Sequence, residues 1–184
     1  MVYIICSATF ISEPGQNRKI AALRVTKCVC FLFVMVIYMN QYMEMALEEA
    51  KKAYKKGDVP VGAVIVKNGK IIAKAHNKKE TNKVSTHHAE ILVIEKACKK
   101  LKNWRLTGCE MYVTLEPCLM SAGAMLQARI EKLYFATSNE KFGYVSSIDN
   151  ILNQKNNHKV EIHEGMCKEE SKKLLVSFFE NKRK

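Results

Sequence analysis

The chain has 184 residues, of which 48% are apolar and 26% charged, a balance typical of a folded globular domain with its own core. Its 30 basic and 18 acidic side chains give a net charge of +12. This excess favours a polyanionic partner, nucleic acid in particular, with a generally basic surface as the alternative. Seven irregularly spaced cysteines exclude a disulfide framework and indicate reduced, cytosolic thiols.

The first 38 residues differ from the rest of the chain. Basic side chains precede an apolar run over residues 28–39, which is shorter than the roughly twenty residues that span a bilayer. The run lacks the small-residue cleavage site of a signal peptide and continues directly into a predicted helix. We therefore expect an atypical extension over 1–38 and a domain over 39–184, with translation beginning at Met39. A disordered or membrane-touching extension is the alternative.

Local patterns define the elements that follow. Apolar residues recur at spacings of three and four over residues 41–54, which predicts a helix that ends at Gly57. Two β-rich runs, 61–66 and 70–73, are joined by Asn68-Gly69, a strong hairpin signal.

The rest of the chain alternates between helical and extended patterns. We expect helices over 88–100 and 117–129, the second with Pro117 in its first turn, a short helix over 149–154 and a closing helix over 168–181. We expect strands over 110–115, 132–137 and 159–163. Together these elements predict an α/β domain of about five strands with helices on both faces.

His88, Glu90 and Cys118 carry chemistry that points to a metal-activated water. Zinc takes nitrogen and sulfur ligands and can keep one position open for water, whose pKa it lowers towards neutrality. A carboxylate that is not a ligand can then move protons. His88 and Cys118 fall at predicted helix starts, where partial positive charge stabilises a thiolate. Residue 121 lies three positions after Cys118 and faces the same way, but it is a serine.

His88-Ala89-Glu90 and Pro117-Cys118 followed by Ser121 resemble the H-x-E…P-C-x-x-C signature of zinc deaminases in the cytidine/deoxycytidylate deaminase-like superfamily, with serine at the last cysteine. Further segments are similar to the bacterial tRNA-specific adenosine deaminases: 57–64, 113–118, 122–125 and 157–162. The similarity runs from about residue 40 to the end.

This resemblance implies a three-layer α/β/α, cytidine-deaminase-like fold with a central mixed sheet. It also implies hydrolytic deamination of adenosine to inosine at the wobble position of a tRNA anticodon, usually in an arginine tRNA. One Zn²⁺ per chain is expected, held by His88, Cys118 and the residue at position 121, with Glu90 as the proton shuttle. The expected protein is a cytoplasmic homodimer whose active sites lie near the interface, and it makes no membrane contact.

Four further residues match substrate contacts of the family. Asn77 matches an asparagine that contacts the flipped base, and a turn residue at a strand end is the alternative. Phe178 and Phe179 match an aromatic pair near the anticodon loop, although core residues would give the same pattern. Asn139 stands where the family usually has aspartate, in a loop that borders the nucleic acid. That loop also carries bulkier side chains here, so the preference between RNA and DNA stays open.

Ser121 leaves more than one functional reading. A hydroxyl is a harder ligand than a thiolate and binds Zn²⁺ less well. The first reading is a working tRNA adenosine deaminase with weakened metal affinity. The second is a catalytically impaired or dead homologue that binds tRNA or a partner subunit. The third is a deaminase of a free base or nucleoside, against which the basic charge and the C-terminal similarity argue.

Overall fold

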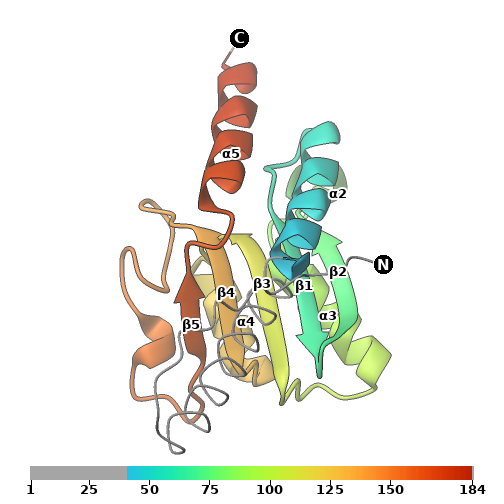
Figure 1. The fold of residues 1–184 in the computed structure, drawn as a ribbon, viewed down its shortest axis with the longest axis vertical. Helices are drawn as coiled ribbons and strands as arrows, with labels where there is room; N and C mark the ends of the chain where they lie inside the picture. The colour runs from blue at the N-terminus through green and yellow to red at the C-terminus, as the bar shows by residue number, and fades with distance from the viewer. Residues whose placement is uncertain (1–40, 184) are drawn as a thin grey trace, which may run out of the picture. The chain divides into compact units, whose positions relative to one another are not determined.

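The computed structural model describes residues 41–183, so the extension expected over 1–38 and the start expected at Met39 lie outside the described residues. A five-stranded sheet has the order β2-β1-β3-β4-β5 (Figure 1). Its strands are β1 (Gly62–Lys67), β2 (Lys70–His76), β3 (Cys109–Leu115), β4 (Lys132–Thr137) and β5 (Glu161–Glu164). The helices are residues 41–55, α2 (Lys79–Asn82), α3 (Ala89–Leu101), α4 (Leu119–Ala128), the 3₁₀ turn η1 (Ile151–Asn153) and α5 (Lys168–Lys182).

The first predicted helix and the hairpin are confirmed. Residues 41–55 are helical, and Gly57 takes the left-handed conformation that ends such a helix, with φ of 78°. Between β1 and β2, Asn68 and Gly69 both have positive φ, at 49° and 71°. A two-residue hairpin turn of this type needs positive φ at both positions, which asparagine and glycine tolerate best.

The sheet is mixed, and four of its strands run in the same direction. β1 is antiparallel to both β2 and β3, whereas β3, β4 and β5 are parallel. The carboxyl ends of β2, β3, β4 and β5 therefore lie at one edge of the sheet. In open α/β sheets this edge is where ligands bind.

Helices cover both faces of the sheet. Ala63 and Ile65 of β1 belong to a core that includes α3 and α4, and Val64 and Val66 belong to a second core with helix 41–55. This alternation follows from the two-residue period of a strand. Figure 1 shows α5 on the same side as helix 41–55, and α5 contacts β3 and β4. The expected α/β fold with two helical layers is confirmed, and no helix within 41–183 is long and apolar enough to cross a membrane.

Element boundaries differ from the sequence prediction at several places, among them β2, which runs to His76 rather than to 73. α4 begins at Leu119 with Cys118 as its N-cap, so the prediction that Pro117 lies in the first turn was wrong. The carbonyl of Pro117 instead accepts a hydrogen bond from the amide of Tyr144 at 3.0 Å. The short helix expected over 149–154 is the three-residue 3₁₀ turn η1. The last strand begins at Glu161 rather than at 159.

The four-residue helix α2 was not predicted. Its amides at Glu80 and Thr81 bind the carboxylate of Asp58, at 2.6 and 3.3 Å. Asp58 is buried and lies 22 residues before Glu80. A short helix stabilised by a distant carboxylate leaves little periodicity in its own sequence.

Candidate active site

His88 and Cys118 are the N-caps of α3 and α4. Both have extended backbone conformations, and neither side chain caps its own helix. The two side chains are therefore available for other contacts, close to amides that have no partner within the helix. The positive end of each helix dipole favours negative charge at these positions.

The side chains of His88, Cys118 and Ser121 come together as the motif predicts. Sγ of Cys118 lies 3.6 Å from Nδ1 of His88 and 3.6 Å from Oγ of Ser121. Two zinc ligands with bonds of about 2.1 and 2.3 Å at a tetrahedral angle stand roughly 3.6 Å apart. These two separations from Cys118 are thus the ones that a tetrahedral zinc site requires.

The side chains at this site would bind zinc less strongly than their positions alone suggest. No group of three His, Cys, Asp or Glu residues suited to a metal occurs within residues 41–183. His88 and Cys118 supply two ordinary zinc ligands, and the third position is the hydroxyl of Ser121, which is fully buried. The residues fit zinc in position, with one hard ligand in place of a soft one.

The pKa values of Cys118 and His88 are shifted by their contact with each other. Burial would raise the pKa of Cys118, but its interactions with His88 and Ser121 outweigh burial and lower the pKa. The hydrogen bond with Cys118 raises the pKa of His88 against the effect of burial. This coupling favours a thiolate beside an imidazolium, and a thiolate is the form that binds metals.

Glu90 lies in the first turn of α3 with 4% of its surface exposed. Burial raises the pKa of its carboxyl group, and the nearby His88 and a hydrogen bond with Ser121 offset only part of that rise. A buried carboxyl group with a raised pKa, held beside candidate metal ligands, is suited to general acid–base catalysis.

Asn77 follows the last residue of β2, at the same edge of the sheet. Its amide donates to the carbonyl of Val61 at 2.9 Å. Its side chain is 5% exposed, and no residue in the described part of the chain hydrogen-bonds to its buried Oδ1. Buried polar atoms normally have hydrogen-bond partners, so Oδ1 of Asn77 retains an unused capacity to accept a hydrogen bond.

Glu116 is a structural residue of this region that the sequence analysis did not single out. It is 2% exposed, and its carboxylate accepts the amides of Asn139, Val145, Ser146 and Ser147 at 2.7–3.1 Å. Burial would raise the pKa of Glu116, but these amides and the hydroxyl of Ser147 outweigh it and lower the pKa. In the sequence, the feature that could have predicted this role is a charged residue directly after a buried strand.

The other predicted substrate contacts have different surroundings. Asn139 is held by Glu116 and accepts the amide of Phe142 on its own Oδ1 at 3.3 Å. Phe178 is 4% exposed and packs edge-on against Tyr54 at 5.6 Å, so it is a core residue. Phe179 is 46% exposed and available for contact. No contact in the described part of the chain joins either phenylalanine to His88 or Cys118.

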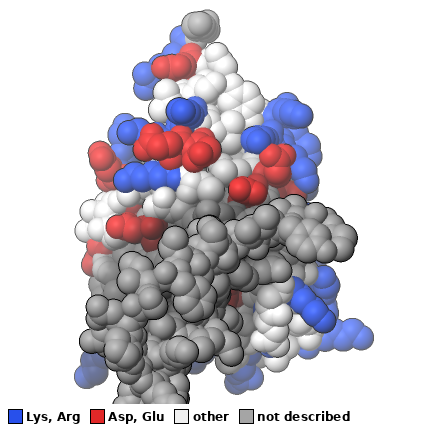
Figure 2. Space-filling model, viewed as in Figure 1, with Lys and Arg blue, Asp and Glu red and all other residues white. Residues whose placement is uncertain are grey.

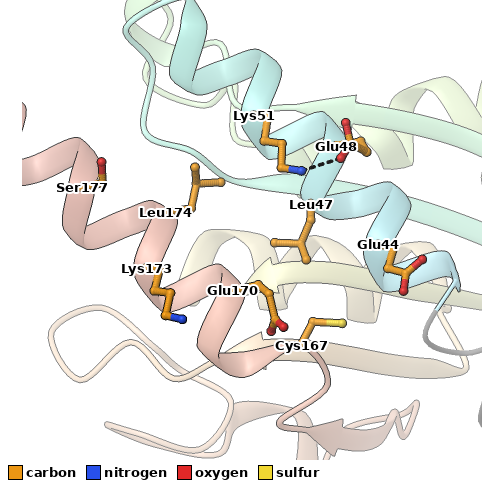
Figure 3. A pocket seen from close by; sticks show the side chains of 9 residues that line it. All are labelled: Glu44, Leu47, Glu48, Lys51, Cys167, Glu170, Lys173, Leu174 and Ser177. Atoms are coloured by element: carbon orange, nitrogen blue, oxygen red, sulfur yellow. Dashed lines mark hydrogen bonds and ion pairs between the residues drawn. The ribbon is translucent and has the colours of Figure 1, made fainter.

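A groove on the opposite face of the sheet contains none of these residues. It measures about 510 Å³ and lies between helix 41–55 and α5, with Leu47 and Leu174 among its lining residues (Figure 3). The ion pair Glu48–Lys51 lies at its side at 2.6 Å. Figure 2 shows basic and acidic side chains interspersed over these two helices. The described side chains of these two helices therefore form no continuous basic field that would attract nucleic acid.

An α/β/α fold with histidine and cysteine at two helix N-termini, and a buried glutamate beside them, defines a nucleobase or nucleoside deaminase. The family model described as MafB19-like deaminase matches residues 38–183. A tRNA-specific adenosine deaminase of Bacillus subtilis (strain 168) is 49% identical over 144 residues, 78% of this chain and 89% of the relative. The corresponding protein of Aquifex aeolicus (strain VF5) is 49% identical over 143 residues, 77% of this chain and 94% of the relative.

A solved structure from studies of A-to-I editing by tRNA:A34 deaminases at the wobble position of transfer RNA is 40% identical, with a TM-score of 0.72. The match covers 73% of this chain and 99% of that one. The chain therefore belongs to the MafB19-like deaminases, and among them to the tRNA-specific adenosine deaminase family.

Proposed function

We propose that this protein converts adenosine to inosine at the wobble position of a tRNA anticodon, with water as co-substrate and ammonia as the second product. The observation that carries this proposal is the placement of His88, Cys118 and Glu90 together at two helix N-termini. The 49% identity to tRNA-specific adenosine deaminases supplies the substrate class. The proposed substrate is an arginine tRNA, and the proposed setting is a cytoplasmic homodimer.

His88 and Cys118 would hold one Zn²⁺ per chain, with Ser121 as the third, weaker donor. When bound, the ion supplies hydroxide at neutral pH by lowering the pKa of a water. Glu90 accepts a proton from the attacking water and delivers protons to the ring nitrogen and to the departing ammonia. Its burial excludes competing solvent from this transfer. Asn77 would hold the base by accepting a hydrogen bond on Oδ1, the atom that has no partner in the described protein.

Inosine formation by the purified full-length chain tests this proposal. The substrate is an arginine-tRNA anticodon stem-loop with adenosine at the wobble position, and a matched stem-loop with guanosine there is the control. Glu90→Gln protein, purified in parallel, excludes a contaminating deaminase of the expression host. We expect inosine only with the wobble adenosine and only with wild-type protein.

Other outcomes distinguish the alternative functions. Ammonia release from free adenosine, guanine or cytidine without turnover of the stem-loop would indicate a small-molecule deaminase. Stem-loop binding without inosine, by protein with less than about 0.1 zinc per chain, would indicate a catalytically dead tRNA-binding homologue. The buried hydroxyl of Ser121 is the observation that favours this second function. Light scattering on the same sample tests the homodimer.

A further inference from the structure

The segment that follows β4 is fixed by one buried side chain. Oε1 of Glu116 accepts the amides of Val145, Ser146 and Ser147 at 3.1, 2.7 and 2.9 Å. Oε2 accepts the amide of Asn139 at 2.8 Å and the hydroxyl of Ser147. A single carboxylate thus fastens both ends of residues 139–147. Hydrogen bonds to a charged acceptor are about twice as strong as neutral ones, so this segment has a defined conformation.

The same segment is attached directly beside the candidate active site. The amide of Tyr144 donates to the carbonyl of Pro117, the residue before Cys118, at 3.0 Å. Gly143 packs so closely on the carboxylate of Glu116 that a Cβ at this position would overlap it. The amide of Gly143 also closes a turn onto the carbonyl of Asn139 at 2.7 Å. Phe142 belongs to this turn, two residues before the Tyr144 amide that binds Pro117.

Phe142 is exposed in spite of its fixed backbone. At 66% it has the largest exposed fraction among the large apolar side chains within 41–183. Its amide is bound by Asn139, at 3.3 Å to the carbonyl and 3.3 Å to Oδ1. Folding therefore gains little apolar burial from this ring, while the backbone that carries it is held in place. A solvent-facing aromatic ring on a well-defined backbone is the element with which proteins stack on unpaired bases.

We propose that Phe142 stacks on a nucleobase that flanks the edited adenosine, and that Glu116 positions it. This inference rests on the proposed function, because it needs an RNA loop at the site. A base that enters a deaminase pocket leaves its stack, so its neighbour loses a stacking partner. Phe142 would replace that partner. The net charge of +9 over residues 39–184, and the exposed Lys141 next to Phe142, favour RNA as the occupant over an apolar protein surface.

Stacking can be measured apart from turnover. In a full-length Glu90→Gln background, an anticodon stem-loop with 2-aminopurine on either side of the wobble adenosine reports stacking as fluorescence quenching. Fluorescence anisotropy gives the Kd. We expect quenching at one flanking position with Phe142 and with Phe142→Trp, and loss of that quenching with Phe142→Ala and Phe142→Leu. The Kd should weaken by about 5- to 100-fold in Phe142→Ala.

Trp104→Ala is the matched control. Trp104 is 53% exposed and follows the far end of α3, a helix of 13 residues that spans about 20 Å. We expect unchanged quenching and Kd for this variant. Unchanged quenching and Kd in Phe142→Ala would overturn the inference. So would dissociation of a dimer by Phe142→Ala, because Phe142 would then belong to an interface between two copies. If the Glu90→Gln protein that retains Phe142 does not bind the stem-loop at all, the proposed function is wrong, and the inference is wrong with it.

Glu116→Gln tests the positioning role. The amide of glutamine offers one acceptor oxygen where the carboxylate offers two, so the contacts to residues 139–147 should weaken while the ring itself is unchanged. In the otherwise wild-type chain, we expect the KM for the stem-loop to rise several-fold, with kcat changing less than twofold. In the Glu90→Gln background, the 2-aminopurine quenching should fall at an unchanged folded fraction by circular dichroism. Full quenching and an unchanged KM would show that Glu116 does not position Phe142.

Discussion

Ser121 and Cys118 lie one helical turn apart on α4, with Oγ and Sγ 3.6 Å from each other. Cysteine at 121 would therefore place a second thiolate where a tetrahedral metal needs it. We expect Ser121→Cys to tighten zinc binding at least about 100-fold, because even residues that only support a ligand change metal affinity 10- to 100-fold. Ser121→Ala should weaken zinc binding relative to the wild type.

Competition with a chromogenic chelator measures both effects on the full-length protein. Cys98→Ser is the control, since it removes a thiol at 98, outside the His88–Cys118–Ser121 cluster. Equal zinc affinity in wild type, Ser121→Cys and Ser121→Ala would show that residue 121 is not a ligand position.

Glu90→Gln should abolish proton transfer and leave metal and RNA binding intact. Glutamine has nearly the same shape as glutamate and cannot accept the proton, and general acid–base groups contribute about 10²- to 10⁴-fold to rate. We expect kcat to fall by that factor while zinc content and the Kd for the stem-loop stay within twofold of wild type. A parallel loss of zinc or of RNA affinity would indicate that Glu90 has a structural rather than a catalytic role.

Asn77→Ala should lower activity without lowering stability by much. Oδ1 of Asn77 is buried with no hydrogen-bond partner in the described protein, so its removal relieves an unmet desolvation cost of about 1–3 kcal/mol. This gain opposes the packing lost with the side chain. We expect the free energy of unfolding in urea to change by less than about 1 kcal/mol, and kcat/KM on the stem-loop to fall at least tenfold. Strong destabilisation with normal turnover would show that Asn77 serves the fold.

Glu116 gives the domain an acid-sensitive contact. Its folded-state pKa lies below the ordinary value of 4.5, so the unfolded chain takes up a proton at higher pH than the folded one. The stabilisation is therefore complete above the unfolded-state pKa and is lost as the pH falls through the folded-state pKa. Glu116→Gln should cost about 2–3 kcal/mol at pH 7, by loss of hydrogen bonds to a charged group, and less below pH 4.5.

Urea unfolding of both proteins between pH 3 and pH 7 checks this expectation. Ser146→Ala is a mild control, because its hydroxyl makes only a 3.4 Å contact with Glu116. A difference in unfolding free energy that does not shrink towards low pH would contradict the assignment of a charged Glu116.

Gly62 is the point at which helix 41–55 meets the sheet. A Cβ there would overlap the backbone of Ala46 and Ala50, so Gly62→Ala should destabilise the protein by about 1–3 kcal/mol through overpacking. Gly123 in α4 has no atom within 4 Å of the position of a Cβ, so Gly123→Ala should be neutral or stabilise by up to about 1 kcal/mol. Thermal unfolding of the Gly62→Ala and Gly123→Ala proteins measures both changes in stability. A loss only in Gly62→Ala would show that the close contact with helix 41–55, rather than the replacement of glycine itself, causes the destabilisation.

Local signals in the sequence predicted much of this fold. Asn68-Gly69 alone indicated the hairpin, since both residues must take positive φ. The N-cap positions of His88 and Cys118 agree with the expected helix starts to within about two residues. These features depend on neighbours within one or two turns of chain.

The parts that sequence reasoning missed depend on partners far along the chain. Asp58 stabilises α2 from 22 residues away, and Glu116 holds residues 23–31 positions ahead. No periodicity records such pairs. Phe178 and Phe179 are adjacent and chemically identical, yet one is buried and the other exposed, because only the packing of α5 against Tyr54 distinguishes them.

The shared direction of β2, β3 and β4 has a consequence for how the protein is assembled. Asn77, Cys118 and Asn139 each follow a different strand, so the complete site forms only when all three strands lie side by side in the sheet. Glu116 can gather residues 139–147 only after β3 and β4 have paired, a contact between distant parts of the chain that forms slowly. The ability to act on a substrate would thus be acquired in one late step. A chain interrupted during synthesis before β4 would carry the metal-binding residues but would lack residues 139–147, the segment that borders them.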